Sequence, residues 1–353
     1  MKAKHALPWL DVGRNACDSP HVVILGAGAS RAVTPNGDRE GRVLPLMADL
    51  IQVVGLEDLL RGVPLADGYQ NFEAVYSRLH ATDPSSPVLG QMEERIREYF
   101  GRLALPNTVT VYDELLLCLR AKDLIATFNW DPLLPYAYAR NRQLGELPRI
   151  IFLHGNVAVG TCLGDRVKGF VGERCNKCGN PLAPSRLLYP IEQKDYASDP
   201  FIAAEWEELS RTLEHAYLLT VFGYAAPESD AEAKKMLGKV WERNRTRELA
   251  QVEIVDIKPR EMLEAAWQSF FVRNHYGVTK EIQNTLPFMF PRRSCDAFAS
   301  ATLQLDPWAT RQLPHFNALD DLRAWVRPLV EEERADRDRK QGFQPFRPEE
   351  RSP

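Results

Sequence analysis

Five short apolar runs constrain the fold of this chain more than any other feature. Each holds four to nine residues rich in Val, Ile, Leu and Phe, without a regular alternation of apolar and polar positions. Strands buried on both faces have this continuous pattern, which is typical of a parallel sheet covered by helices. The runs lie at residues 22–25, 123–128, 149–154, 216–224 and 252–257.

Segments with helical periodicity separate these runs. In residues 45–63 the apolar positions return to one face at helical spacing, and five further segments have similar patterns. Ser229 or Asp230 is placed to cap one of these helices. The alternation of strand and helix predicts an α/β fold with a doubly wound parallel sheet. The five further segments are 88–105, 111–121, 201–216, 228–244 and 260–274.

Two regions depart from this alternation. Residues 157–200 are rich in Gly, Cys, Pro and Lys and have no long periodic segment, so we expect a small Cys-containing insert. Residues 331–353 are charged and contain prolines, which predicts a solvated, disordered tail. The predicted organisation is an N-terminal extension (1–19), a core domain (20–275), a helical or irregular extension (276–330) and the tail (331–353).

The composition excludes several classes of protein. With 353 residues, 44% of them hydrophobic and 26% charged, the chain has the composition of an ordinary globular protein. Its net charge of −4 argues against direct nucleic-acid binding. No apolar stretch reaches the roughly 18 residues that span a membrane. Six cysteines are too few for a secreted disulfide framework, and residues 1–14 lack the apolar core of a signal peptide, so we expect a cytoplasmic protein.

Small and polar residues follow the predicted strands at their carboxyl ends, where open parallel sheets bind ligands. Taken singly, His154 can be an ordinary buried histidine, and Asp256 a turn residue. Asn129 and Asp131 can cap the helix that follows them. Taken together the residues form a candidate site, because glycines let a backbone approach a ligand and a late acidic residue suits ribose hydroxyls. The candidates are Gly26, Ala27, Gly28, Ser30, Thr127, Asn129, Asp131, His154, Gly223, Asp230 and Asp256.

The order of four short motifs resembles that of the sirtuin superfamily over about residues 20–275. The motifs are Gly-Ala-Gly-Ala-Ser (26–30), Thr-Phe-Asn-Trp-Asp (127–131), Leu-His-Gly (153–155) and Cys-Asn-Lys-Cys (175–178). The resemblance implies a Rossmann-like NAD-binding catalytic domain in which residues 26–30 bring the backbone against the diphosphate of NAD. It also implies that Asn129 and Asp131 hold the nicotinamide ribose and the attacking group, and that His154 is the catalytic base.

Three segments depart from the deacylating sirtuins. The loop after residue 30 lacks their Gly-Ile-Pro-Asp-Phe-Arg segment, and residues 185–196 replace the Phe-Gly-Glu stretch that pairs with an acyl-lysine peptide. Residues 223–237 resemble the Gly-Tyr/Phe-Ser-x-x-Asp pattern of divergent prokaryotic sirtuin-like proteins, many of which destroy cellular NAD during phage infection. The resemblance therefore favours an NAD glycohydrolase of anti-phage defence. An NAD-dependent deacylase or ADP-ribosyltransferase is one alternative, and a non-catalytic NAD or ADP-ribose sensor or scaffold subunit is another.

An enzyme that depletes its own cell of NAD must be held in check. The resemblance therefore implies a homo-oligomer, or a partner protein, that controls the activity, and no association with a membrane. The presence of both Asn129 and His154 favours an enzyme over a sensor, because a sensor has little need of a base.

The cysteines leave two interpretations open. The sirtuin zinc site takes two Cys-x-x-Cys pairs, whereas this chain has one such pair, Cys175 and Cys178. Cys162 and Asp165 lie upstream and complete a formal tetrahedral set, since a carboxylate oxygen is an accepted zinc ligand. The other interpretation is a relic pair that holds no metal. A bound zinc would stabilise the insert without taking part in catalysis.

Overall fold

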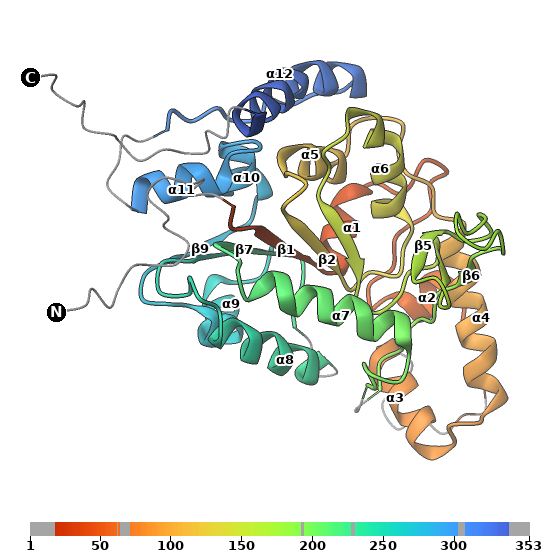
Figure 1. Ribbon diagram of the computed structural model, residues 1–353. Helices are drawn as coiled ribbons and strands as arrows, with labels where there is room; N and C mark the ends of the chain where they lie inside the picture. Colours follow the sequence, from red (N-terminus) through yellow and green to blue (C-terminus); the bar gives the residue numbers. More distant parts are fainter. Residues whose placement is uncertain are drawn as a thin grey trace, which may run out of the picture.

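The computed structural model describes residues 18–61, 63, 71–191, 194–226, 230–302 and 308–338. Its central sheet contains β1 (His21–Leu25), β2 (Leu124–Thr127), β3 (Arg149–Phe152), β7 (Leu218–Phe222), β8 (Gln251–Val255) and β9 (Tyr276–Thr279). All are parallel, in the order β3-β2-β1-β7-β8-β9 (Figure 1). This is the strand order of the doubly wound dinucleotide-binding fold, so the predicted fold class is confirmed.

The strand registers bring the carboxyl ends of the inner strands to one edge of the sheet. Leu25 at the end of β1 lies between Thr127 of β2 and Phe222 of β7. Phe222 is in turn level with Val255 of β8. The residues that directly follow these four strand ends include most of the candidate site. The segments that carry them therefore leave the sheet side by side.

Strand β9 is not predicted by the sequence pattern. Its residues, Tyr276–Thr279, are all half-buried at the edge of the sheet, so they lack the continuous apolar pattern of the inner strands. Because β9 pairs with β8, the core sheet extends past residue 275. The expectation that the region 276–330 is helical or irregular throughout is therefore wrong at its start.

Helices cover both faces of the sheet (Figure 1). Helix α7 shows why they form: Asp199 accepts hydrogen bonds from the N–H groups of Phe201 and Ile202, and Pro200 occupies the first helical position. Its buried side includes Trp206, which packs toward the sheet. One face carries α1 (Ala27–Val33), α5 (Val111–Cys118) and α6 (Leu133–Asn141), and the other carries α7 (Pro200–Leu213), α8 (Ala231–Glu242) and α9 (Arg260–Trp267).

The helix predicted over residues 45–63 forms only in part. Helix α2 spans Leu50–Val54, and Gly55 ends it with a left-handed backbone, φ +76°. Leu44, Leu56 and Leu60 on either side of α2 are nevertheless buried. The apolar periodicity of this segment therefore reflected its burial and not a continuous helix.

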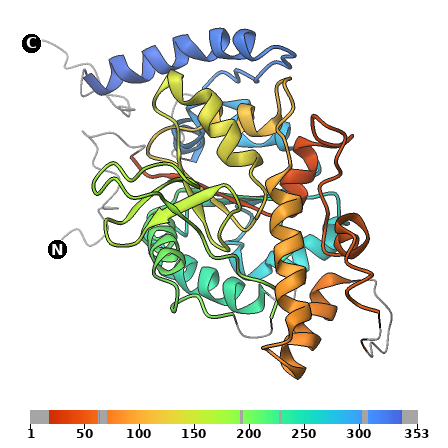
Figure 2. The same cartoon turned by 90° about the vertical axis from the view of Figure 1, so that its right-hand side faces the viewer.

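Two helices and a small sheet stand beside the core. Helices α3 (Phe72–Thr82) and α4 (Pro87–Gly101) pack against each other (Figure 2). The predicted insert contains an antiparallel sheet in which β4 (Val159–Cys162) lies between β5 (Val167–Phe170) and β6 (Ala183–Pro184). Arg97 of α4 donates to the carbonyl oxygen of Ser185 at 3.2 Å and joins the helical pair to the insert.

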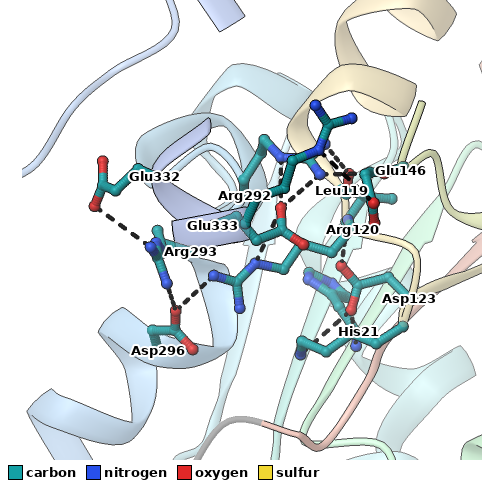
Figure 3. Close-up of polar contacts among 12 residues, drawn as sticks. His21, Leu119, Arg120, Asp123, Glu146, Arg292, Arg293, Asp296, Glu332 and Glu333 are labelled. Atoms are coloured by element: carbon teal, nitrogen blue, oxygen red, sulfur yellow. Dashed lines mark hydrogen bonds and ion pairs between the residues drawn. The ribbon is translucent and has the colours of Figure 1, made fainter. Parts of the chain in front are cut away.

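Buried charges tie the C-terminal helices to the core (Figure 3). The guanidinium of Arg292 is buried and donates to Glu333 of α12 (Leu319–Asp338) at 2.8 Å and to the carbonyl oxygen of Leu119 at 2.8 Å. Residues 331–338, which we expected in the disordered tail, therefore belong to α12, because Glu333 is the partner of a buried arginine. Residues 1–17 and 339–353 lie outside the described part of the chain.

The remaining short elements complete the C-terminal half and the connections. They are α10 (Leu286–Met289), α11 (Ser294–Thr302) and the 3-10 turns η1 (Arg142–Leu144), η3 (Gln268–Phe270) and η4 (Ile282–Asn284). Within the described ranges, no helix has the length and apolar character that crossing a bilayer requires.

Candidate functional site

A cavity of about 430 Å³ lies at the carboxyl edge of the sheet. Its wall combines apolar side chains such as Phe128, Trp130 and Leu44 with a few polar groups, as small-molecule sites do. Two candidate residues, Ser30 and Thr127, are buried and do not line it. The nine other candidates line it: Gly26, Ala27, Gly28, Asn129, Asp131, His154, Gly223, Asp230 and Asp256.

The glycine turn after β1 packs against the turn after β7. The N–H of Gly28 donates to the carbonyl oxygen of Gly223 at 2.9 Å. A Cβ atom on Gly28 would lie 2.8 Å from Cα of Gly223, and one on Gly26 would lie 2.5 Å from the carbonyl oxygen of Gly223. These glycines therefore allow the backbone after β1 to pack directly against the backbone after β7. The two backbone segments together form one wall of the cavity.

The amide of Asn129 is held in one orientation. Its Nδ2 donates to the carbonyl oxygen of Gly26 and to Oγ of Ser30, each at 2.8 Å. Because a carbonyl oxygen can only accept, the NH₂ group must face Gly26, and Oδ1 is left as the acceptor that this side chain offers to the cavity. The interpretation of Asn129 as a cap of α6 is wrong, since that helix has no side-chain cap from it.

A layer of hydroxyl groups stands behind Asn129. The hydroxyl of Tyr112, on α5, lies 2.6 Å from Oγ of Ser30 and 3.3 Å from Nδ2 of Asn129. Oγ1 of Thr127 accepts from the backbone N–H of Asn129 at 3.0 Å. Ser30 and Thr127 were predicted to contact the cofactor, but the structure places them as supports of Asn129. Tyr112 was not predicted, because nothing in the pattern of α5 distinguishes it from a core residue.

Asp131 combines a structural and a site position. Its Oδ1 accepts from the N–H of Leu133 at 3.1 Å, so the interpretation as a residue that satisfies the start of α6 is confirmed. The backbone carbonyl of Asp131 accepts from Nδ2 of Asn156 at 2.6 Å, which fixes the turn. Burial raises the pKa of Asp131 to about 6, although hydrogen bonds from Ser30 and Leu133 oppose this shift.

His154 is buried among aromatic rings. Phe128 meets its ring edge-on with the centroids 4.8 Å apart, and Tyr196 stacks on it at 5.9 Å. Nε2 lies 3.3 Å from the hydroxyl of Tyr196 and 3.9 Å from Oδ1 of Asp230. Burial lowers the pKa of His154 to about 3, although the charge of Asp230 acts in the opposite direction. The imidazole is therefore neutral at pH 7, and because burial disfavours its charged form, it can take a proton only with the support of the neighbouring charge of Asp230.

Asp230 pairs with a lysine that the sequence pattern did not single out. Nζ of Lys194 bonds to Oδ1 of Asp230, and the hydroxyl of Tyr224 donates to Oδ2 at 3.1 Å. Burial opposes ionisation of Asp230, but the charges of His154 and Lys194 and these hydrogen bonds hold its pKa below the usual value. Asp230 precedes α8 without a capping bond from its side chain, and Ser229 lies outside the described residues.

Asp256 lies at the rim of the cavity after β8. It is half-buried, and its Oδ1 accepts from the N–H of Lys258 at 3.0 Å, as expected for a turn residue. The same residue lines the cavity together with Ile257, which is 84% exposed. The turn and the ligand interpretations of Asp256 are therefore compatible.

Besides Tyr112, three further residues of the site were missed: Lys194, Tyr196 and Tyr224. Tyr224 directly follows Gly223 at a strand end, and this position could have identified it as a site residue. Lys194 and Tyr196 lie in a connection that returns from the insert to the sheet edge and whose described residues form no helix or strand. No periodicity marks the path of such a connection, so the sequence does not predict its contacts.

Four side chains of the insert meet in a candidate metal centre. The ligand atoms of Cys162, Asp165, Cys175 and Cys178 all lie within 4.8 Å of one another. Sγ of Cys162 and Sγ of Cys178 are 3.7 Å apart, close to the separation of about 3.8 Å that tetrahedral zinc requires with Zn–S bonds of about 2.3 Å. Three sulfurs and one carboxylate oxygen are ligands that zinc accepts, and the separation of the Cys162 and Cys178 sulfurs is that of a tetrahedral site.

The doubly wound sheet and the cavity at its carboxyl edge define a Rossmann-like α/β protein with a candidate small-molecule site. No protein-family model matches the chain, and no curated protein matches its sequence. A crystal structure of a Sir2 homologue in complex with NAD aligns with 88% of this chain and 90% of its own, at 14% identity and a TM-score of 0.36. A structure of Sir2 bound to an acetylated peptide aligns with 81% of this chain and 92% of its own, at 15% identity and a TM-score of 0.36.

Proposed function

We propose that the protein is an NAD glycohydrolase, which converts NAD and water into nicotinamide and ADP-ribose. The observation that carries the proposal is that His154 and Asn129, from the ends of different strands, line one cavity with the glycine turn. A neutral imidazole can take a proton, and a fixed amide oxygen can hold the group that loses it.

The residues of the cavity wall suit the parts of NAD. Backbone at Gly26–Gly28 lines the cavity where the diphosphate would lie, and the carboxylate of Asp256 can accept from two ribose hydroxyls. Phe128 and Trp130 supply apolar surface for the planar rings. Nε1 of Trp130 is buried without a hydrogen-bond partner among the described residues.

In the proposed reaction the bond between ribose C1′ and nicotinamide breaks, and a water oxygen bonds to C1′. The electron pair of the broken bond leaves with nicotinamide, while the ribose passes through a state with oxocarbenium character. Oδ1 of Asn129 positions the water, and His154 takes its proton. Asp230 faces Nε2 of His154 at 3.9 Å and would stabilise the imidazolium that forms, while Asp131 holds the nicotinamide ribose.

Product analysis tests this proposal. The purified chain is incubated with NAD, with and without an acetylated peptide, and nicotinamide and ADP-ribose are quantified. We expect equal amounts of both products without the peptide, from the wild type and from His215→Ala, an exposed-histidine control, and little from His154→Ala. Nicotinamide release that requires the peptide would indicate a deacylase. Binding of NAD without any product would indicate a sensor.

A role in anti-phage defence, and control by a homo-oligomer or a partner protein, follow from the proposed activity and from the motif resemblance. The proposed role predicts that cellular NAD falls after phage infection in bacteria that carry the wild-type chain. Cells that carry His154→Ala at the same expression level should keep their NAD. Equal NAD levels in both strains throughout infection would contradict the role.

For the insert we propose a structural zinc ion held by Cys162, Asp165, Cys175 and Cys178, supported by the fit of these donors to a tetrahedral ion. Zinc binding would be coupled to the folding of the insert. Cys175→Ser should therefore release zinc and lower the melting temperature, while turnover per folded molecule changes little. Elemental analysis that finds no zinc in the wild-type protein would contradict the proposal.

A further inference from the structure

A second cavity, of about 480 Å³, lies between α3, α4 and the connection that leaves the insert. We call residues 186–191, Lys194 and Asp195 of this connection the dividing segment. Leu188 and Lys194 line both the second cavity and the candidate NAD cavity. The dividing segment therefore forms a common wall between the two cavities.

Two arginines of the second cavity have no carboxylate partner among the described residues. Arg97 has Glu93 and Glu94 four and three positions before it on α4, where helical ion pairs usually form. Its guanidinium nevertheless donates to the carbonyl oxygen of Ser185 at 3.2 Å. Arg186 is exposed, and its Nη1 lies 3.5 Å from Oγ of Ser198. Neither guanidinium therefore forms a direct ion pair with a carboxylate of the described chain, although the charge of Arg186 acts on the nearby Asp195.

Most acids in the same wall are already engaged. Oε1 of Glu93 accepts from the hydroxyl of Tyr76 at 2.5 Å. Oδ1 of Asp195 accepts from the N–H groups of Ala197 and Ser198, each at 2.9 Å. Glu94, the third acid that lines the cavity, is exposed to solvent. A guanidinium presents a planar fork of donors that matches phosphate oxygens, so two guanidinium groups without a carboxylate partner on one cavity suit a phosphate group.

The dividing segment is bonded directly to the groups of the candidate NAD site. The N–H of Leu188 donates to the carbonyl oxygen of His154 at 3.0 Å. The carbonyl oxygen of Arg186 lies so close to Gly155 that a Cβ atom there would be 1.8 Å from it. At the other end of the segment, Lys194 pairs with Asp230. A ligand that binds Arg186 therefore contacts a segment that is hydrogen-bonded to the backbone of His154. The same segment carries Lys194, which pairs with the carboxylate of Asp230 beside the His154 ring.

We propose that the second cavity binds a small phosphate-bearing ligand through Arg97 and Arg186, and that this ligand controls the neighbouring site through the dividing segment. The binding half of the proposal stands on the cavity and its arginines alone. The control half rests on the proposed NAD hydrolysis.

Calorimetry with inorganic pyrophosphate as the probe tests the binding half. Arg186→Met, on an exposed side chain, should weaken binding about tenfold or more, the effect of losing a charge-assisted hydrogen-bonded pair. Arg97→Lys, which retains the charge but loses the fork, should also weaken it. Arg78→Met, an exposed arginine of α3 outside the cavity, should bind like the wild type. No binding by the wild type, or equal affinity in all four proteins, would overturn the site.

The experiments distinguish failure of the phosphate site from failure of the proposed NAD hydrolysis. Pyrophosphate binding that depends on Arg186, in a protein that does not hydrolyse NAD, would retain the site and overturn the proposed function. Hydrolysis of NAD without such binding would do the reverse. If both hold, pyrophosphate should change the rate of nicotinamide release in the wild type and leave it unchanged in Arg186→Met. An equal rate with and without pyrophosphate in the wild type would overturn the control.

Discussion

The two polar walls of the candidate NAD cavity are built from different interactions. The Asn129 wall (Asn129, with Ser30 and Tyr112 behind it) holds its amide by hydrogen bonds among neutral groups and one backbone carbonyl. The His154 wall (His154, Lys194, Tyr196 and Asp230) places an imidazole next to a buried ion pair. The Asn129 wall fixes the position of an amide whose hydrogen bonds do not depend on a charge. The His154 wall sets the proton affinity of an imidazole, which changes with the charges next to it.

The largest expected effect comes from removing the key group of each wall. Asn129→Ala and His154→Ala should each lower turnover by about 10²–10⁴, the range for a positioned base and its partner. Because both would act on one transition state, the double variant should be far less impaired than the product of the two single effects. Nicotinamide release, measured for all three variants alongside thermal melting, checks this. Effects that multiply would mean that the two walls work independently.

A large effect on stability is expected where the turns after β1 and β7 meet. A Cβ atom on Gly223 would lie 2.2 Å from the backbone nitrogen of Ala29, and φ at Gly223 is +62°. Gly41 also has a positive φ, +79°, but nothing lies within 4 Å of the added atom. Gly41→Ala should therefore cost about 1–2 kcal/mol, the left-handed backbone penalty alone, and Gly223→Ala clearly more. Equal free energies of unfolding in denaturant titrations would show that the two turns are not tightly packed.

Lys194→Met should change the His154 wall and leave the Asn129 wall unaltered. It removes a cation that lowers the pKa of His154 and releases Asp230, which raises it, so the pKa of His154 should rise from about 3. An NMR titration of the imidazole measures the shift, with Lys239→Met, an exposed lysine of α8, as the control. An unchanged pKa in Lys194→Met would show that Lys194 does not compete for Asp230.

The lowered pKa of His154 in the wild-type protein also makes stability depend on pH. The folded pKa of His154 lies below its value of 6.5 in an unfolded chain, so the unfolded state binds the proton more tightly. The stability that neutral His154 contributes is complete above about pH 6.5 and is lost as the pH falls toward 3. Lys194→Met should reduce this loss, and thermal melting between pH 7 and pH 4 measures it, each variant being compared with its own value at pH 7.

Tyr112→Phe is the smallest test and acts on the Asn129 wall alone. It removes the hydroxyl that lies 2.6 Å from Oγ of Ser30, one layer behind Asn129. The loss of one such hydrogen bond costs about 1 kcal/mol, so turnover should fall about fivefold while the pKa of His154 stays the same. Tyr138→Phe on α6 is the control. A turnover equal to that of the control would show that Asn129 does not need this support.

The parts of the molecule that the sequence could predict are those with a repeating physical cause. The inner strands are buried on both faces, so their apolar residues run without interruption, and parallel registers bring their ends to one edge. The half-buried edge strand β9 leaves no such trace. Asn129 and His154 could be predicted because they follow strand ends directly. Lys194 could not, because it reaches the cavity on a connection whose path is set by tertiary contacts such as its pairing with Asp230.

The most direct test of the central claim is nicotinamide release from NAD by wild-type protein and by His154→Ala, each normalised to the folded fraction. We expect release by the wild type, a loss of about 10²–10⁴ in His154→Ala, and retained NAD binding, because the glycine turn and Asp256 are unchanged. If His154 is merely a buried structural residue, the substitution lowers stability and leaves turnover per folded molecule near normal. Full activity in folded His154→Ala protein would contradict the catalytic role of His154.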